Sequence, residues 1–202
     1  MQSTNPVSPI GPEDRTTLRA SLAMAVLVLG GFGFLYSVGG AALGRLTFPR
    51  QATGSLVMVD GQARGSGLIA QPFADPRYFQ PRPSAANYDP MAAAGSNLAR
   101  SNPDMRKRID GLVQAVAQRD GIAPAQVPGE LATQSGGGLD PHLSPAGAMV
   151  QVARVARERG LPAATVRDLV AAHTEGPQLG LLGQPRVNVL ELNLALDAMS
   201  RQ

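Results

Sequence analysis

The chain has 202 residues, of which 44% are hydrophobic and 16% charged, and its formal net charge is +3 at pH 7. It contains no cysteine, which excludes disulfides, thiolate nucleophiles and cysteine-based metal sites. Aromatic residues make up only 4% and tryptophan is absent, so any core has to be built mainly from aliphatic side chains.

The first predicted element is a membrane-spanning helix. Residues 20–44 form the only long uncharged run, and they exceed the roughly 20 apolar residues needed to cross a hydrocarbon core about 30 Å thick. Residues 1–19 precede the span, and the prolines within residues 1–14 predict a disordered tail. The apolar run is too long for a cleavable signal, so we interpret it as an uncleaved anchor, with cleavage near residues 39–42 as the alternative.

The positive residues beside the span do not indicate which of its ends lies in the cytoplasm. Positive residues near the ends of a span favour the cytoplasmic side, but two arginines precede this one and two follow it. The four are Arg15, Arg19, Arg45 and Arg50.

Glycines are frequent within the span, and Gly40 and Gly44 have the GxxxG spacing. In a membrane, small residues at this spacing allow a second helix to approach closely. The pattern predicts an anchor that packs against another protein and not against lipid alone.

A β-hairpin is predicted after the span. Residues 55–59 are rich in β-branched and aliphatic side chains, Asp60-Gly61 is a strong turn signal, and residues 62–70 supply the second strand. Residues 71–103 then form a proline-rich loop of about 30 residues, which is uncommon in a compact domain. The loop contains Tyr78, Phe79 and Tyr88. These rings either pack against a partner or fix the loop to its own domain, and the sequence leaves both readings open.

Helices are predicted for the rest of the chain. Asn102-Pro103-Asp104 is a helix start and Gly121 a stop. Ser144-Pro145 starts a second helix, Leu161-Pro162 separates it from a third, and Asn188 begins a final helix with the pattern of a capping box. The expected apolar positions are Ile109, Leu112, Val113 and Val116 in the first helix; Met149, Val152, Ala153 and Ala156 in the second; Val166, Leu169 and Val170 in the third; and Val189, Leu192, Leu196 and Met199 in the last. The predicted fold is an α+β domain of one hairpin and about four helices, over residues 45–202, on a single N-terminal transmembrane helix.

Sequence signatures of catalysis are absent. The chain has no GxxxxGK[ST], HExxH or GxSxG motif. His142 and His173 are far apart in sequence and are interpreted as structural or surface residues. Asp140, His142 and Ser144 lie too close together, at alternating positions, for the geometry of a catalytic triad. The basic run of residues 106–108 is flanked by acids and is interpreted as a solvated helix face, so nucleic acid is not an expected partner.

A glycine run is the one feature that suggests a ligand. Ser135, Gly136, Gly137 and Gly138 precede the helix that starts at Ser144. Glycine amides and a helix start are able to hold a phosphate around residues 134–145. The alternative is a flexible loop leading into a capped helix, and the lack of a nearby lysine favours that alternative.

Several segments resemble the C subunit of Kdp-type potassium-transporting ATPases. The resemblance runs in order over about residues 20–198 and includes the single span. Its most specific part is the closing run Gly183-Gln184-Pro185-Arg186-Val187-Asn188-Val189-Leu190-Glu191-Leu192-Asn193-Leu194-Ala195-Leu196-Asp197. The other matching segments are 54–56, 67–71, 82–85, 95–98, 102–103, 135–146 and 154–156.

The resemblance implies a non-catalytic accessory subunit of an ATP-driven potassium uptake complex. Its partners would be a channel-like subunit, an ATP-hydrolysing P-type subunit, a small single-span subunit and the lipid bilayer. It implies an inner-membrane protein with residues 1–19 in the cytoplasm, the span at residues 20–44, and residues 45–202 outside. It also implies a role in assembly and in raising the ATP affinity of the hydrolysing subunit. No cofactor of the chain's own is expected, and ATP would be met only through that subunit. Nucleotide contacts, where present, would involve Ser135, Gly136, Gly137, Gly138 and Gln151.

Two other functions are compatible with the residues. One is a membrane-anchored exported hydrolase, which would need Ser135 or Ser144 paired with His142 or His173. The other is a membrane-bound regulator that binds a nucleotide at the glycine run.

Overall fold

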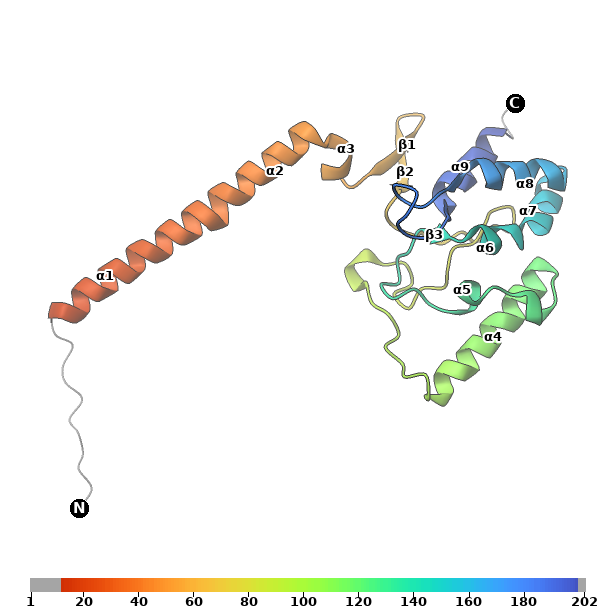
Figure 1. The fold of residues 1–202 in the computed structure, drawn as a ribbon, viewed down its shortest axis with the longest axis horizontal. Helices are drawn as coiled ribbons and strands as arrows, with labels where there is room; N and C mark the ends of the chain where they lie inside the picture. The colour runs from red at the N-terminus through yellow and green to blue at the C-terminus, as the bar shows by residue number, and fades with distance from the viewer. Residues whose placement is uncertain (1–11, 200–202) are drawn as a thin grey trace, which may run out of the picture. The chain divides into compact units, whose positions relative to one another are not determined.

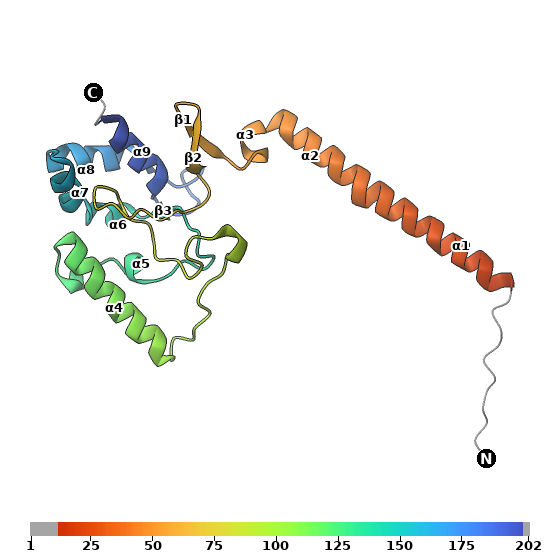
Figure 2. The same ribbon diagram turned by 180° about the vertical axis from the view of Figure 1, so that it is seen from behind.

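The computed structural model describes residues 12–199 in two units (Figures 1 and 2). The first unit extends to Gly54 and contains the apolar helix. The second starts at Ser55 and contains both sheets and the remaining helices. The predicted disordered tail lies mostly within residues 1–11, which are outside the described residues.

The apolar helix is continuous from Pro12 to Thr47. It consists of α1 (Pro12–Leu27), the π-helical segment η1 (Val28–Leu35) and α2 (Tyr36–Thr47). It begins at Pro12, inside the predicted tail. The segment Thr16–Thr47 is, among the described residues, the one helix that is long and apolar enough to cross a membrane. A single turn, α3 (Pro49–Ala52), follows it.

The predicted hairpin is confirmed. Strand β1 (Leu56–Val59) pairs antiparallel with β2 (Gln62–Ser66), with an irregularity in register between Val57 and Met58. The turn residues Asp60 and Gly61 both have positive φ, of 52° and 74°. Two successive positive φ values are the requirement of a type I′ turn, which is why Asp-Gly predicts this hairpin.

Helix α4 (Pro103–Asp120) has the predicted boundaries. The Asn102 side chain accepts a hydrogen bond from the Asp104 amide at 2.8 Å, and Gly121 ends the helix at a φ of 68°. Between β2 and α4 the chain is irregular except for the turn η2 (Pro90–Ala92), as the proline-rich composition predicts.

The remaining elements are short. They are η3 (Pro124–Gln126), α5 (Gly129–Ala132), β3 (His142–Leu143), α6 (Pro145–Met149), α7 (Val152–Arg159), α8 (Ala163–Ala172), β4 (Thr174–Glu175), β5 (Arg186–Asn188) and α9 (Val189–Met199). The three strands form an antiparallel sheet in the order β3-β5-β4, which the sequence did not predict because two or three residues show no alternation. In both views α4 and α5 lie at one end of the domain and α8 and α9 at the other (Figures 1 and 2).

The helix predicted to begin at Ser144 is interrupted at Gln151, and its predicted apolar face is wrong at two positions. The Gln151 backbone amide donates to the Ala148 carbonyl and not to the Gly147 carbonyl, as it would in a continuous α-helix. The Gly147 carbonyl accepts from the Gln151 side chain. This turn changes the register between α6 and α7. As a result Met149 and Ala153 are exposed, whereas Arg154 and Val155 are buried.

The core lies between α7, α8, α9, β5 and the loop before α4. Phe79, in that loop, is completely buried with side chains from every one of these elements. The other buried members include Leu131, Leu143, Val152, Val155, Val166, Val170, Val187, Leu192 and Leu196. The α+β class is therefore confirmed, with a second small sheet that supports α9.

Candidate functional site

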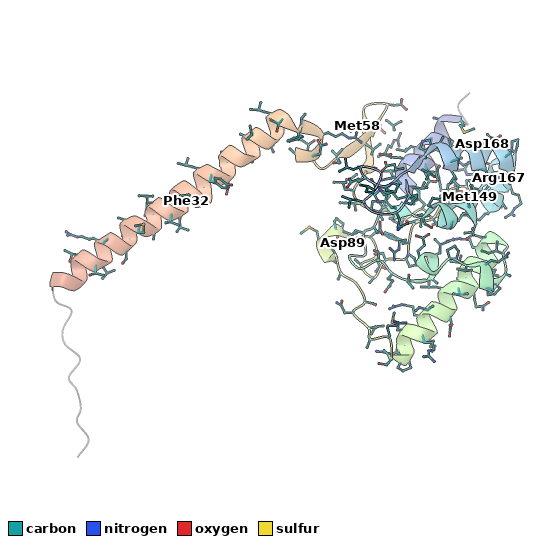
Figure 3. The ribbon with its side chains drawn as sticks, viewed as in Figure 1. Phe32, Met58, Asp89, Met149, Arg167 and Asp168 are labelled. Atoms are coloured by element: carbon teal, nitrogen blue, oxygen red, sulfur yellow. The ribbon has the colours of Figure 1, made fainter. Side chains whose placement is uncertain are left out.

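The outer surface of the apolar helix is the first functional feature. Its large apolar side chains are exposed from Leu18 to Leu46, and Phe32, labelled in Figure 3, is typical of them. Such a surface is far larger and more continuous than the apolar patches that soluble proteins expose. Within a bilayer the same side chains would meet hydrocarbon, and the helix satisfies its own backbone hydrogen bonds.

The glycines of this helix have no role in the packing of the chain itself. A Cβ atom built on Gly30, Gly31, Gly39, Gly40 or Gly44 would meet nothing within 4 Å. Glycine is an unfavourable residue inside a helix, by about 1 kcal/mol relative to alanine. The described residues give no reason for this concentration, and the close approach of a second helix that the GxxxG spacing at Gly40 indicates stays a prediction.

The glycine run of the second unit packs against the loop that precedes α4. The Ser135 amide donates to the Pro83 carbonyl at 3.4 Å, and the Gly138 amide donates to Ser135 at 3.2 Å. Gly138 has a φ of 72°, and a Cβ there would lie 2.8 Å from the Ala94 carbonyl oxygen. Ser135 and Gly138 are buried, whereas Gly136 and Gly137 are exposed. Ser135 and Gly138 therefore pack within the fold, and the two glycines between them lie at the surface.

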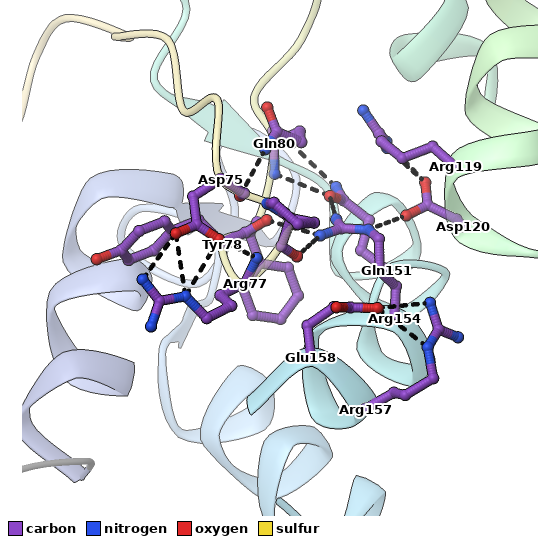
Figure 4. A network of polar contacts seen from close by, with 12 residues as sticks. Asp75, Arg77, Tyr78, Gln80, Arg119, Asp120, Gln151, Arg154, Arg157 and Glu158 are labelled. Atoms are coloured by element: carbon purple, nitrogen blue, oxygen red, sulfur yellow. Dashed lines mark hydrogen bonds and ion pairs between the residues drawn. The ribbon is translucent and has the colours of Figure 1, made fainter. Parts of the chain in front are cut away.

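Gln151 and Asn193 bind an irregular segment, residues 76–80, that passes through the centre of the domain. Asn193 Oδ1 accepts from the Phe79 amide at 2.8 Å, and its Nδ2 donates to the Phe79 carbonyl at 3.0 Å. Gln151 does the same for Gln80, at 2.8 and 3.1 Å (Figure 4). Both amides replace the hydrogen bonds that a neighbouring strand would provide, which is how Phe79 can be buried.

Arg154 completes this support (Figure 4). Its Nη1 donates to the carbonyls of Pro76 and Tyr78, and its Nε donates to Asp120 Oδ1 at 2.6 Å. Asp120 is buried at the end of α4 and also accepts from Arg119 Nη2 at 2.6 Å. Burial lowers the pKa of Arg154, while Asp120 opposes that effect. One guanidinium thus joins α7, α4 and the loop segment of residues 76–80.

Gln151 is not available at the surface. Its side chain is fully buried, and its four hydrogen bonds are made to Gln80, Gly147 and Arg154. A nucleotide would have to displace one of them to reach it. Among the predicted contacts, only Gly136 and Gly137 present backbone to solvent.

The loop aromatics attach the loop to its own domain, which decides between the two readings of the sequence. Besides the burial of Phe79, the Tyr78 hydroxyl donates to Asp197 at 2.9 Å. The Tyr88 hydroxyl instead stays within the loop and donates to the Arg82 carbonyl at 2.9 Å. The Arg159 guanidinium lies 4.8 Å above the Tyr78 ring. Burial, and then the bond to Asp197, raises the pKa of Tyr78, and burial raises the pKa of Tyr88.

The serines and histidines proposed for a hydrolase do not form a nucleophile–base pair in the described structure. Ser144 Oγ donates to Glu130 at 2.5 Å and accepts from the Gly147 amide, so it caps α6. His173 Nδ1 contacts the Leu169 carbonyl at 3.0 Å, and His142 Nδ1 lies 3.8 Å from Asp140. Within residues 12–199, no group of three or more His, Asp or Glu side chains is arranged to hold a metal ion.

Comparisons with known proteins agree with one another. A family profile described as "K+-transporting ATPase, c chain" matches residues 18–198. A protein of Xanthomonas oryzae pv. oryzae (strain MAFF 311018), named potassium-transporting ATPase KdpC subunit, is 64% identical over 184 residues, covering 91% of this chain and 88% of its own length. Proteins of the same name are 52% identical in Sorangium cellulosum, covering 89% of this chain and 96% of the relative, and 54% identical in Methylococcus capsulatus, covering 83% and 90%.

Proposed function

The chain belongs to the KdpC family and is a membrane-associated accessory subunit of a potassium-transporting ATPase complex; from this premise we propose that its role is to assemble and stabilise that complex. The single observation that carries the proposal is the apolar helix Thr16–Thr47, which is exposed throughout and rich in glycines that the chain itself does not require. A helix of this kind is suited to lie against other membrane helices.

The proposed arrangement has one span in the cell inner membrane. Residues 1–19 lie in the cytoplasm, residues 20–44 cross the bilayer, and residues 45–202 form the extracytoplasmic domain. The balanced arginines do not orient the span, and the proposed orientation is supported by the resemblance to the family alone. In it, the glycine side of the anchor packs against the channel-like subunit, and the domain covers the outer mouth of the ion path. The ATP-hydrolysing subunit and the small single-span subunit are the other partners.

The interior of the domain supports an accessory role. Its buried polar groups, Gln151, Arg154 and Asn193, are hydrogen-bonded to the chain's own backbone and to one another. Such groups hold a loop in place and leave few free polar atoms for catalysis. We propose that the subunit acts through surfaces that contact its neighbours and has no catalytic site of its own.

Deleting residues 1–46 should release the rest of the chain in soluble form and abolish its assembly with the other subunits. The reason is that this deletion removes the only candidate span among the described residues. The measurement is co-purification of the other subunits with the tagged chain from a detergent extract. An intact complex after the deletion would refute the anchor role.

A matched pair of span variants separates helix packing from simple anchoring. Gly40 and Gly44 lie one turn apart on one side of the helix, and Ala42 lies on the other side. Replacing both glycines by leucine should reduce co-purification while the chain stays in the membrane fraction. Ala42→Leu is the control and should leave assembly unchanged. Equal yields from both variants would show that the glycine side makes no close contact.

For ATP, we propose that the subunit raises the affinity of the hydrolysing subunit indirectly, through contacts between the subunits. The alternative is direct contact with the glycine run, which would require this domain to lie on the same side of the membrane as ATP. Direct contact is favoured by the exposed backbone of Gly136 and Gly137. A substitution at Gly136 or Gly137 should alter ATP binding if the contact is direct, and should leave it unchanged if the effect is indirect.

Gly137→Glu distinguishes them in the assembled complex. A Cβ at Gly137 meets nothing within 4 Å, so the fold should tolerate the change, and the added carboxylate would repel a phosphate. With an indirect role, we expect the KM for ATP to stay unchanged, as in the control Gly111→Glu on the exposed side of α4. A rise in the KM for ATP with Gly137→Glu alone would contradict the indirect route.

A further inference from the structure

The two most exposed leucines of the domain, Leu179 and Leu181, lie together in the loop between β4 and β5. This leucine loop, residues 176–185, belongs to the blue segment between α8 and α9 in Figure 1. Leu179 is 90% exposed, Leu181 87% and Leu182 61%. Single exposed leucines are common on proteins, but three within four residues at the end of one loop form a patch that needs an explanation.

The leucine loop binds its own backbone polar groups. Gln178 and Leu182 exchange two hydrogen bonds, of 2.8 and 2.9 Å. The Gly180 amide donates to the Pro177 carbonyl at 3.0 Å, and the Leu181 amide donates to the Gln178 carbonyl at 3.1 Å. An amide left without a partner makes transfer into an apolar medium expensive. The loop thus meets much of the backbone requirement for entering a bilayer interface.

The tip has a fixed shape that turns its side chains outward. Leu179 has a φ of 54° and Gly180 a φ of 74°. Positive φ is unfavourable for a residue as large as leucine, and such conformations persist where the surrounding structure fixes them and are concentrated at functional sites. Here the two hydrogen bonds between Gln178 and Leu182 close the tight turn that contains Leu179 and Gly180.

The composition of the loop favours a lipid surface over a protein partner. Residues 176–185 contain no charged and no aromatic residue. The residues that dominate protein–protein contacts are Trp, Tyr and Arg, whereas leucine is under-represented among them. An uncharged, leucine-rich tip matches the boundary between headgroups and acyl chains, where leucine is a common inserted residue.

The connector between the two units limits how far the domain can move from the end of the apolar helix. The apolar helix ends at Thr47 and the domain begins at Ser55, so the seven connecting residues reach about 25 Å at most. The Gly67 amide donates to the Ser55 carbonyl at 3.0 Å, and the Asn188 side-chain amide donates to the Gly67 carbonyl at 2.8 Å. Asn188 ends β5, the three-residue strand that begins where the leucine loop stops. A tethered domain needs only a weak lipid contact, because the tether keeps the local concentration of lipid high.

We propose that the leucine loop inserts into the leaflet of the membrane on the domain's own side and forms a second, shallow membrane contact besides the anchor. This inference rests on the proposed anchoring function, because the tether brings the loop to lipid. Its consequence is that the domain is held at two points and not by one flexible connector.

The absence of cysteine from the chain makes the test direct. The full chain carrying Leu181→Cys is labelled with an environment-sensitive fluorophore and reconstituted alone into phosphatidylcholine vesicles that contain lipids brominated on the acyl chain. We expect quenching several-fold stronger than for Arg167→Cys, an exposed position on α8. Adding Leu182→Asp to Leu181→Cys should remove the excess quenching.

Three outcomes overturn the proposal in distinguishable ways. Equal, weak quenching at both positions shows that the loop stays in water. Absence of quenching in vesicles, combined with protection of Leu181→Cys from aqueous thiol reagents only in the assembled complex, assigns the loop to a protein partner. Failure of the chain to enter vesicles refutes the anchoring function itself, and the loop proposal with it.

Discussion

Replacing Arg154 by methionine should lower the free energy of unfolding of the domain by about 3–5 kcal/mol, the usual cost of breaking a buried ion pair from one side. The change leaves the Pro76 and Tyr78 carbonyls without their donor and removes the 2.6 Å bond to Asp120. Denaturant unfolding of the full chain in detergent, followed by circular dichroism, measures the loss.

Arg167→Met is the matched control for that experiment. Arg167 is exposed on α8, and exposed substitutions usually change stability by less than about 0.5 kcal/mol. Arg154→Lys keeps the charge but not the fork of donors, so it should fall between the two. If Arg154→Met were as stable as the control, the guanidinium would not hold the loop segment in place.

Gly138→Ala should destabilise the domain more than Gly160→Ala, although both residues adopt a left-handed backbone, with φ of 72° and 65°. Each variant should lose about 1–2 kcal/mol because a Cβ is unfavourable in that conformation. At Gly138 the new Cβ would also lie 2.8 Å from the Ala94 carbonyl oxygen, whereas at Gly160 it would meet nothing within 4 Å. The clash should cost a further roughly 1–3 kcal/mol.

The comparison also bears on the glycine run as a ligand site. Thermal and denaturant midpoints of the two variants, measured in the same detergent, give the difference directly. Gly137→Ala should have almost no effect, because its Cβ would meet nothing within 4 Å. Equal losses for Gly138→Ala and Gly160→Ala would contradict the packing of the run against the loop, and would remove the structural explanation of that glycine.

Elements with local signals could be predicted from the sequence. The hairpin follows from Asp60-Gly61, and α4 begins and ends where Asn102 and Gly121 place its caps. Three of the four apolar positions predicted for α9 are confirmed as well, since Val189, Leu192 and Leu196 are buried, whereas Met199 is half-buried. In each case the residues that specify the element lie within or directly beside it, so one stretch of sequence is enough.

The polar centre of the domain could not be predicted in the same way. Phe79 and Asn193 are 114 residues apart, and Arg154 and Asp120 are 34 apart, so no local pattern relates them. One signal was available but was not used. Asp120 occupies the last position of α4, where the helix dipole disfavours a carboxylate, and this predicts a cation nearby. That cation is Arg154, together with Arg119.

The way residues 76–80 are held has a consequence for how the protein is made. Their partners Gln151, Arg154 and Asn193 are synthesised about 70 to 115 residues later, so these long-range hydrogen bonds cannot form as the segment is synthesised. Contacts that are distant in sequence slow folding, because a long loop must close before they form. The membrane helix is synthesised early and can insert at once, whereas the core of the domain stays open until α9 has been added. Newly made chains should therefore pass through a state that is anchored but still unfolded, and quality control in the cell would act on that state.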